Sequence, residues 1–305
     1  MKDSAKGDTL LKCDTEPDSN IGIAKMPIRV LFLCLARNCA DTIPLFFSYL
    51  QRLETYGFCC RAIIGENGSS DRTRSLIEDA AGPKIAVLDT SMMEVGSSRL
   101  IRMAMGRQAL LDAALSEGIR EDYVCVADLD NVMTSPPDPE AVRVAIRRLQ
   151  TDTALFAVGA TSLPVYYDLL SLRVEGFGFL SNLNKELTDA KKRPLSYFRF
   201  HQRRIYSNQR LVTSDAAVLC GSSFNGFCFY NAADYCLGSY RAPDEAEVCE
   251  HVSLNLSIGR VTGKKMLIAP ELVIHAPADH TPVGFLRFWY DRTIKRLARV
   301  CIAWR

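Results

Sequence analysis

The sequence predicts an α/β protein with one mostly parallel, doubly wound sheet flanked by helices. Short apolar runs recur along the first half of the chain, and segments with helical spacing separate them. Strands that alternate with helices in this way pair in parallel, and ligands then bind beyond the carboxyl ends of the strands. With 305 residues and 48% hydrophobic content, the chain can bury one large core or two modest ones.

The first half of the chain is regular. After a polar lead-in over residues 1–26, four apolar runs have the length and composition of buried strands: 28–36, 58–65, 84–89 and 122–130. The intervening segments predict helices or polar turns that lead into helices: 42–57, 66–82 and 99–115. In the first of these helices Leu45, Tyr49 and Leu53 share one face, and Gly57 ends the helix.

The second half is less regular. It contains, in order, a predicted helix at 139–150, a strand at 154–161 and a basic polar stretch at 185–210. A glycine-rich segment at 220–231, a helix at 249–259 and a strand at 266–275 follow. We therefore expect a single domain over 27–282, with a nucleotide-binding half over 27–135 and an irregular acceptor half over 136–282.

The last segment, 283–305, predicts a basic amphipathic helix. It has six lysines and arginines against Asp291. Its apolar stripe consists of Leu286, Trp289, Ile294, Leu297, Cys301 and Trp304. The cations on the opposite face are Arg292, Lys295, Arg296 and Arg299. Such a helix either packs on its own domain or lies as a peripheral contact on an anionic membrane.

Composition limits the compartment and the partners. A net charge of +2 favours neither a nucleic-acid binder nor an acidic tail. Residues 1–26 lack the apolar centre of a secretion signal, and no apolar run approaches the roughly 18 residues of a spanning helix. The 11 cysteines form no CxxC pair, which favours reduced thiols. We expect a cytoplasmic protein, soluble or peripheral on the inner face of the plasma membrane.

Two polar segments follow predicted strands and should share one edge of the sheet. They are "ENGSSD" at 66–71 and the exit of "YVCVADLDNV" at 123–132, which contains Asp128 and Asp130. The paired aspartates have two interpretations. One is an ordinary turn carried by Asn131, and the other is a pair of oxygen ligands for a divalent cation on a diphosphate.

The order of these segments resembles a known family. "LARNCADTI", "IGENGSSDRTRSLIE", "SSRLIRMAMGRQALL" and "DYVCVADLDNV" resemble the consecutive blocks of a GT-A fold glycosyltransferase. "YYDLLSLR", "SSFNGFCFY" and "CEHVSLNL" resemble later blocks of the fungal capsular α-1,3-mannosyltransferase type and its bacterial relatives. The resemblance implies a Rossmann-like GT-A fold and a metal-dependent hexosyltransferase. Its donor would be a GDP- or UDP-linked sugar, with mannose a candidate, and its acceptor a glycan or a lipid-linked saccharide.

The resemblance also implies a metal site for Mn²⁺ or Mg²⁺. Asp130 matches the direct ligand of the DxD motif, and Asp128 would share the metal or face the ribose. His275, at the end of a predicted strand, would be a third ligand, because an imidazole beside carboxylates is compatible with manganese. His280 competes for this role, and either histidine is also compatible with a structural position.

Further residues match the family's donor-binding positions. Ala36 and Arg37 end the first strand, Glu66 or Asn67 would bind base or ribose, and Arg99 would meet the diphosphate. Ser69 and Asp71 are expected to shape a turn and cap the next helix. Arg37 is equally compatible with surface charge, and Arg102 and Arg107 are interpreted as a solvated helix face.

In the glycine-rich segment, Asn225 would reach the hydroxyls of the donor sugar, and Gly226 lets backbone approach a ligand. Tyr167, Asp168 and Arg173 match a family block without an assigned role.

Glu250 is the candidate catalytic carboxylate, together with Asp130. By resemblance it lies near the reacting sugar, where a carboxylate deprotonates an acceptor hydroxyl or stabilises positive charge. The alternative is a carboxylate stabilised by the dipole of its helix, and His251 is either packed or catalytic. Two other functions remain open. A sugar-nucleotide pyrophosphorylase would need a glycine-rich basic loop that "LARNCADT" lacks, and an inactive homologue would bind a glycan or a partner transferase.

Overall fold

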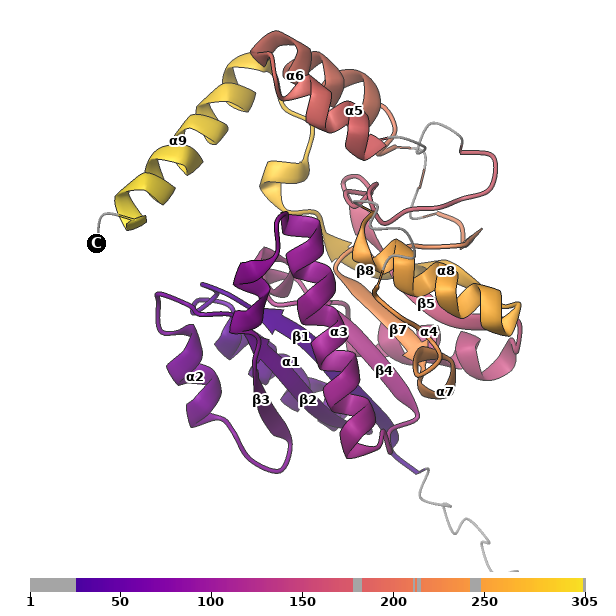
Figure 1. Cartoon of the computed structure of the whole chain (residues 1–305). Helices are drawn as coiled ribbons and strands as arrows, with labels where there is room; N and C mark the ends of the chain where they lie inside the picture. Colours follow the sequence, from indigo (N-terminus) through magenta and orange to yellow (C-terminus); the bar gives the residue numbers. More distant parts are fainter. Residues whose placement is uncertain (1–25, 178–182, 211, 213–214, 242–247, 304–305) are drawn as a thin grey trace, which may run out of the picture.

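An eight-stranded mixed sheet forms the centre of the protein (Figure 1). The computed structural model describes residues 26–177, 183–210, 212, 215–241 and 248–303, except for the side chains of Asn184, Asp279 and residues 295–303. The strands are ordered β3-β2-β1-β4-β7-β5-β8-β6. Their bounds are β1 Ile28–Ala36, β2 Phe58–Glu66, β3 Ile85–Asp89, β4 Tyr123–Asp128, β5 Leu155–Leu163, β6 Val218–Cys220, β7 Phe227–Asn231 and β8 Lys265–His275.

The parallel strands bring the two polar segments to one edge, as the sequence predicts. β1 pairs in parallel with both β2 and β4, and β2 pairs in parallel with β3. Leu35 of β1 is in register with Gly65 of β2 and Asp128 of β4. The carboxyl ends of three neighbouring strands therefore lie side by side, and the loops that follow them share one rim.

Helices cover both faces of the sheet because the strands are apolar on both sides. The helices are α1 Ile43–Thr55, α2 Thr73–Asp79, α3 Arg99–Glu117, α4 Pro139–Thr151, α7 Ala232–Tyr235 and α8 Glu250–Thr262. Phe32 packs in the same buried cluster as Phe46 of α1 and Ile146 of α4. Its neighbour Leu33 belongs to a second cluster with Leu110 of α3 and Leu254 of α8.

Two strands are antiparallel to their neighbours, and both lie in the glycine-rich segment 220–231 or directly before it. β7 is antiparallel to β4 and β5, and β6 is antiparallel to β8. We predicted no strand in 220–231. Gly226, with φ of +81°, turns the chain into β7, and residues 227–230 are then buried on both faces of the sheet, so no polar–apolar alternation marks the strand.

A group of helices that we call the cap lies at one end of the sheet (Figure 1). The cap consists of α5 Leu183–Ala190, α6 Pro194–Phe200, the π-helical turn η4 His201–Tyr206 and α9 Phe285–Ala303. α9 is the predicted C-terminal helix, and Figure 1 shows it extending away from α6. Phe288 of α9 is fully buried and packs edge-on against Tyr197 and Phe198 of α6.

Several predictions lie outside the described part of the chain. These are the lead-in up to residue 25 and the side-chain pattern at Lys295, Arg296, Leu297, Arg299, Cys301, Trp304 and Arg305. Within the described residues, every helix is too short or too polar to cross a membrane.

Candidate active site

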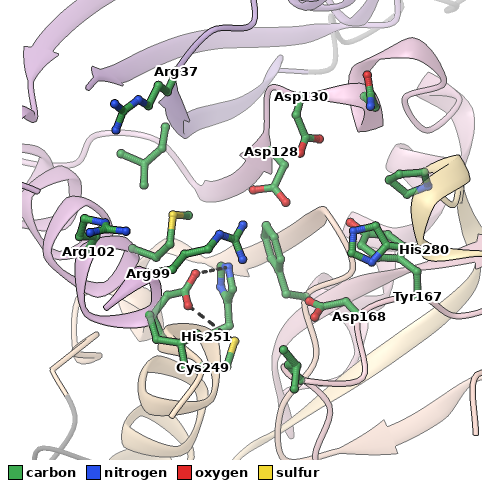
Figure 2. Close-up of a pocket in the computed structure, with 18 of the residues that line it drawn as sticks. Arg37, Arg99, Arg102, Asp128, Asp130, Tyr167, Asp168, Cys249, His251 and His280 are labelled. Carbon is green, nitrogen blue, oxygen red and sulfur yellow. Dashed lines mark hydrogen bonds and ion pairs between the residues drawn. The ribbon is translucent and has the colours of Figure 1, made fainter. Parts of the chain in front are cut away.

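A pocket of about 630 Å³ opens at the shared rim, between the sheet and the cap. Its walls come from the ends of β1, β2 and β4, the start of α3, the start of α8, and the inner side of the cap. Many of the residues singled out from the sequence line it, and Figure 2 labels several of them; they include Ala36, Arg37, Asn67, Arg99, Asp128, Asp130, Asp168 and Glu250. Residues from distant blocks of the sequence thus meet in one cavity.

Asp128 forms an ion pair with the buried Arg107. The Nη2 atom of Arg107 lies 2.6 Å from Oδ1 of Asp128, and Nη1 donates to the carbonyl of Leu33 at 3.4 Å. The Arg107 side chain is 1% exposed and that of Asp128 is 29% exposed. Burial raises the pKa of Asp128 to about 7, and the nearby carboxylates add to the rise, whereas Arg107 opposes it.

The prediction of a solvated Arg107 is wrong. The residue is one position away from the helix face shared by Arg99 and Arg102, and the rotation about the helix axis that this position brings points its side chain into the core. Its guanidinium also lies 5.5 Å from the centre of the Phe224 ring. Arg107 is therefore a buried counter-ion for Asp128, and a buried charge needs such a partner.

Arg99 and Arg102 both line the pocket, but they differ in their contacts. Arg102 donates to the carbonyl of Gly96 at 3.2 Å, which ties it to the loop before α3. Arg99 is exposed, and Figure 2 shows its side chain extending into the pocket. Arg99 is the cation of this helix that is placed to meet an anionic ligand.

Asp130 both forms a turn and lines the pocket. Its Oδ1 accepts a hydrogen bond from the backbone amide of Val132 at 3.1 Å and caps the short helix η2, Asn131–Thr134. The same side chain is exposed and lines the pocket (Figure 2). The turn therefore exists, and Asp130 rather than Asn131 caps it.

Two neighbouring polar residues at the end of β2 have different environments: one is a buried carboxylate, and the other is an amide that lines the pocket. Glu66 is fully buried and accepts hydrogen bonds from the amides of Gly68 and Ser69 and from Arg74. Burial alone would raise its pKa, but the hydrogen bonds and Arg74 outweigh that effect and lower it. Glu66 does not line the pocket, so the structure does not bring it to the predicted donor site.

Asn67 does reach the pocket. It is 5% exposed, and its buried Oδ1 has no hydrogen-bond partner among the described residues. Ser69 and Asp71 shape the turn as predicted: Ser69 Oγ accepts from the amide of Asn38, and Asp71 accepts from the amides of Thr73 and Ala40. Neither is the N-cap of α2, which is Arg72 without a side-chain cap. Asn67 is therefore the polar group of this loop that remains for a ligand.

Arg37 reaches the pocket and is paired with Glu94 of η1, Ser91–Val95. Both side chains are about half exposed, so water screens the pair and its contribution to stability is small. Ala36 also lines the pocket and accepts the amide of Asn67 at 3.1 Å. The end of β1 is thus joined to the Asn67 loop.

Glu250 is the first residue of α8 and is 6% exposed. Its Oε1 lies 3.5 Å from Nε2 of His251, and its Oε2 lies 3.6 Å from Sγ of Cys249 (Figure 2). Burial raises the pKa of Glu250, and Arg107 opposes the rise. A carboxylate with a raised pKa is a stronger proton acceptor than an ordinary one.

His251 is held in one orientation. Its ring stacks on Phe224 with 3.6 Å between centroids, and burial lowers the pKa of the imidazole well below its usual value. The neutral ring has a buried Nδ1 without a hydrogen-bond partner among the described residues. His251 is therefore packed, as one interpretation predicted, and it also lines the cavity, so a catalytic role stays a prediction.

Asn225 and Gly226 lie behind the pocket wall instead of in it. Asn225 is fully buried with φ of +53°, and its backbone N–H donates to Oδ2 of Asp168 at 3.4 Å. A Cβ at Gly226 would lie 2.7 Å from the hydroxyl of Tyr167. The structure thus does not bring Asn225 or Gly226 into the pocket lining, and the contact of Asn225 with a donor sugar stays a prediction. These two residues position Asp168 and Tyr167, which do line the cavity.

The two candidate histidines are separated. His275 is exposed at the end of β8, where it is in register with Leu163, and it does not line the pocket. His280, in the short helix η5 Ala278–His280, does line it and lies 5.3 Å from the ring of Tyr167. The structure thus brings the competitor, His280, to the cavity.

The cap supplies pocket residues that we did not predict: Leu187, Lys191, Tyr197, His201 and Ile205. Their one sequence signal is the basic stretch 185–210, which mixes cations with aromatic side chains.

The aspartate pair fits a divalent cation only in part. Each carboxylate uses Oδ1 in the contacts described above, and both residues line the pocket. Mg²⁺ is commonly bound by one or two carboxylates together with substrate phosphates, so two aspartates are sufficient when a diphosphate supplies further oxygens. Among the described residues, no three His, Cys, Asp or Glu side chains are grouped to hold a metal by themselves.

The fold and the pocket define a class: an α/β protein with carboxylates, a cation and a free amide in a cavity at the carboxyl ends of parallel strands. No family model and no curated protein matches the chain. Solved structures do. Glucosyl-3-phosphoglycerate synthase from Mycobacterium tuberculosis, in complex with Mg²⁺ and UDP, matches with a TM-score of 0.45 and 15% identity, over 84% of this chain and 72% of that chain.

A second similar structure is mannosyl-3-phosphoglycerate synthase from Rubrobacter xylanophilus, with a TM-score of 0.39 and 13% identity, over 87% of this chain and 70% of that chain.

Proposed function

We propose that this protein is a metal-dependent glycosyltransferase of the GT-A type that uses a nucleoside-diphosphate sugar as donor. The observation that carries the proposal is the meeting of Asp128, Asp130, Asn67, Arg99 and Glu250 in one pocket at the rim of the parallel strands. Turn chemistry alone gives no reason for these residues to converge. Open α/β sheets bind their ligands at this edge.

In this proposal Asp130 and Asp128 hold Mn²⁺ or Mg²⁺ together with the donor diphosphate. When bound, the cation would stabilise the negative charge that the leaving diphosphate develops. Arg107 keeps Asp128 oriented from the core side, and Arg99 contacts the diphosphate oxygens from the start of α3. Arg107 is already engaged with Asp128 and is covered by protein, so it does not reach the ligand itself.

Asn67, Ala36 and Arg37 form the nucleoside side of the pocket. The buried and unpartnered Oδ1 of Asn67 requires a donor such as a base N–H or a ribose hydroxyl, because an unpaired buried acceptor is costly. A GDP- or UDP-linked donor would supply such a group.

Glu250 is proposed to act on the acceptor. Its raised pKa suits a group that takes the proton of an acceptor hydroxyl while that oxygen bonds to the anomeric carbon. The bond from the anomeric carbon to the diphosphate breaks, and the electron pair leaves with the diphosphate. His251, whose Nε2 lies 3.5 Å from Oε1 of Glu250, is proposed to help orient this carboxylate. Mannose as the sugar, and a glycan or lipid-linked saccharide as the acceptor, are the finer part of the proposal.

The test uses isosteric variants. Thermal shift against GDP-, UDP- and dTDP-linked sugars with Mn²⁺ would identify the donor. Turnover of that donor is then measured for wild type, Asp130→Asn and Glu250→Gln. Asn at position 130 can still cap η2, so folding should survive. We expect each change to reduce turnover by roughly a hundredfold or more.

Asp138→Asn is the matched control. Asp138 also caps a helix through its side chain, accepting from the amide of Glu140, but lies outside the pocket. This variant should retain full activity. Metal-dependent turnover that is equal in wild type and Asp130→Asn would show that the central assignment is wrong. No metal-linked nucleotide binding at all would favour an inactive binding protein.

A further inference from the structure

One face of α9 is apolar, exposed and without a covering element in the described structure. Leu286, Tyr290 and Ile294 are 84%, 61% and 48% exposed. They are spaced by four residues, so they form one stripe along the helix. At 100° per residue, Leu286 and Tyr290 point about 160° away from Phe288, the residue that anchors α9 to α6. The stripe therefore faces away from the cap's own packing contact.

The same part of the protein is strongly basic. Segments 185–210 and 283–305 together contain 14 of the 37 lysines and arginines but only 3 of the 35 aspartates and glutamates. The rest of the chain consequently has a net negative charge. In the described residues, Arg193, Arg199 and Arg203 are exposed and have no acidic partner. The cap is thus a cationic unit on an acidic body.

These observations point to one kind of partner, and we propose that the cap docks on an anionic lipid bilayer through α9. The apolar stripe would insert between the headgroups, and the exposed cations Arg193, Arg199 and Arg203 would contact lipid phosphates and carboxylates. Tyr290 suits this location because it is 61% exposed and aromatic residues with a polar edge favour the membrane interface.

The charge distribution argues against a second copy of the chain as the partner. Joining two caps stripe to stripe would bring two basic surfaces together, which is repulsive. An anionic bilayer supplies both the apolar layer and the complementary charge.

The location of the stripe has a consequence for the pocket, and this step rests on the proposed function. Lys191, Tyr197 and His201 line the cavity from the inner side of the same cap. A cap on the bilayer therefore places this wall of the pocket close to the lipid surface. An acceptor that is anchored in the membrane by a lipid could then enter the pocket without leaving the membrane.

Vesicle co-sedimentation of the full chain tests the docking independently of activity. Wild type should bind phosphatidylcholine vesicles that contain phosphatidylserine and should bind pure phosphatidylcholine vesicles at least roughly tenfold more weakly. The double variant Leu286→Asp/Tyr290→Asp should bind the anionic vesicles at least roughly tenfold more weakly than wild type. Both side chains are exposed, so the fold should tolerate the changes.

A matched control is Leu219→Asp/Val261→Asp, which changes two apolar residues that are 56% and 65% exposed but lie on β6 and α8, outside the cap. This control should bind like wild type. A second test pair, Arg193→Glu/Arg199→Glu, should remove the preference for anionic vesicles.

Three results would overturn the proposal. They are no binding of wild type to anionic vesicles, equal binding by the Leu286/Tyr290 variant, and an equal loss in the control pair. Sedimentation without lipid addresses the alternative partner: a dimer that Leu286→Asp/Tyr290→Asp abolishes would assign the stripe to a second copy. Turnover of a soluble donor does not enter this test, so a failed glycosyltransferase assignment leaves the vesicle result interpretable.

Discussion

The buried pair of Arg107 and Asp128 gives the sharpest stability prediction. Replacing Arg107 by Met retains most of the side-chain volume and removes the guanidinium that lies 2.6 Å from Oδ1 of Asp128. Breaking a buried ion pair by removing one partner costs about 3–5 kcal/mol, because a charge is left without compensation. Asp128 retains some contact with water, so we expect the lower end, about 3 kcal/mol.

A double-mutant cycle measures this pair directly. The free energy of unfolding in urea is determined for wild type, Arg107→Met, Asp128→Asn and the double variant. Each single change leaves one unpaired group, whereas the double change leaves neither charge. The loss in the double variant should therefore be smaller than the sum of the two single losses by about 2 kcal/mol.

Additivity of the two losses within about 0.5 kcal/mol would refute this reasoning. It would mean that Arg107 acts through packing on Phe224 and not through charge. Arg52→Met, which breaks an exposed pair with Asp138, is the control and should cost less than about 1 kcal/mol.

Three further predictions concern the fold around the pocket. Gly226→Ala places a Cβ at 2.7 Å from the Tyr167 hydroxyl in a backbone with φ of +81°, so it should lower the free energy of urea unfolding by about 2 kcal/mol. The control Gly118→Ala is also at positive φ but has open space around the new Cβ, and it should lower that free energy by about 1 kcal/mol. Phe288→Ala removes the buried anchor of α9, and hydrogen exchange should show α9 amides less protected by about 3 kcal/mol while the sheet is unchanged. Burial lowers the pKa of His201 to about 4, so the folded state binds fewer protons than the unfolded one; unfolding free energy should fall between about pH 6.5 and 4, and His201→Phe should flatten that slope.

The shared rim could be predicted because its cause is local. β1, β2 and β4 are apolar runs separated by helices, and parallel pairing follows from that alternation. Once the strands are parallel, the residues after Ala36, Glu66 and Asp128 have to meet. The prediction needed no knowledge of any side-chain contact.

The role of Arg107 could not be predicted in the same way. Helical spacing places it one position from Arg99 and Arg102, and a charged residue there is usually solvated. Its burial depends on Asp128, which is 21 residues further along the chain and on a different element. Periodicity describes one helix at a time, so a compensating charge on a strand leaves no mark in the pattern.

The choice between His275 and His280 depends on an irregularity in β8. Ala160 of β5 pairs with Ala269, but the next residue, Thr161, pairs with Val273, so residues 270–272 are extra in β8. Such a bulge shifts everything that follows it along the sheet edge. The strand therefore ends with His275 outside the cavity, and η5 brings His280 back to it.

Asp130 shows why a structural and a functional interpretation of one residue need not compete. A carboxylate has two oxygens, and in Asp130 one of them caps η2 through the amide of Val132. That hydrogen bond fixes the direction in which the second oxygen points. A ligand group that is already oriented loses less freedom when it binds a cation. The turn chemistry that alone would explain "DLDN" is thus also what would prepare Asp130 for a metal. Asp130→Asn preserves the first role and weakens the second, so stability and turnover should separate in this one variant.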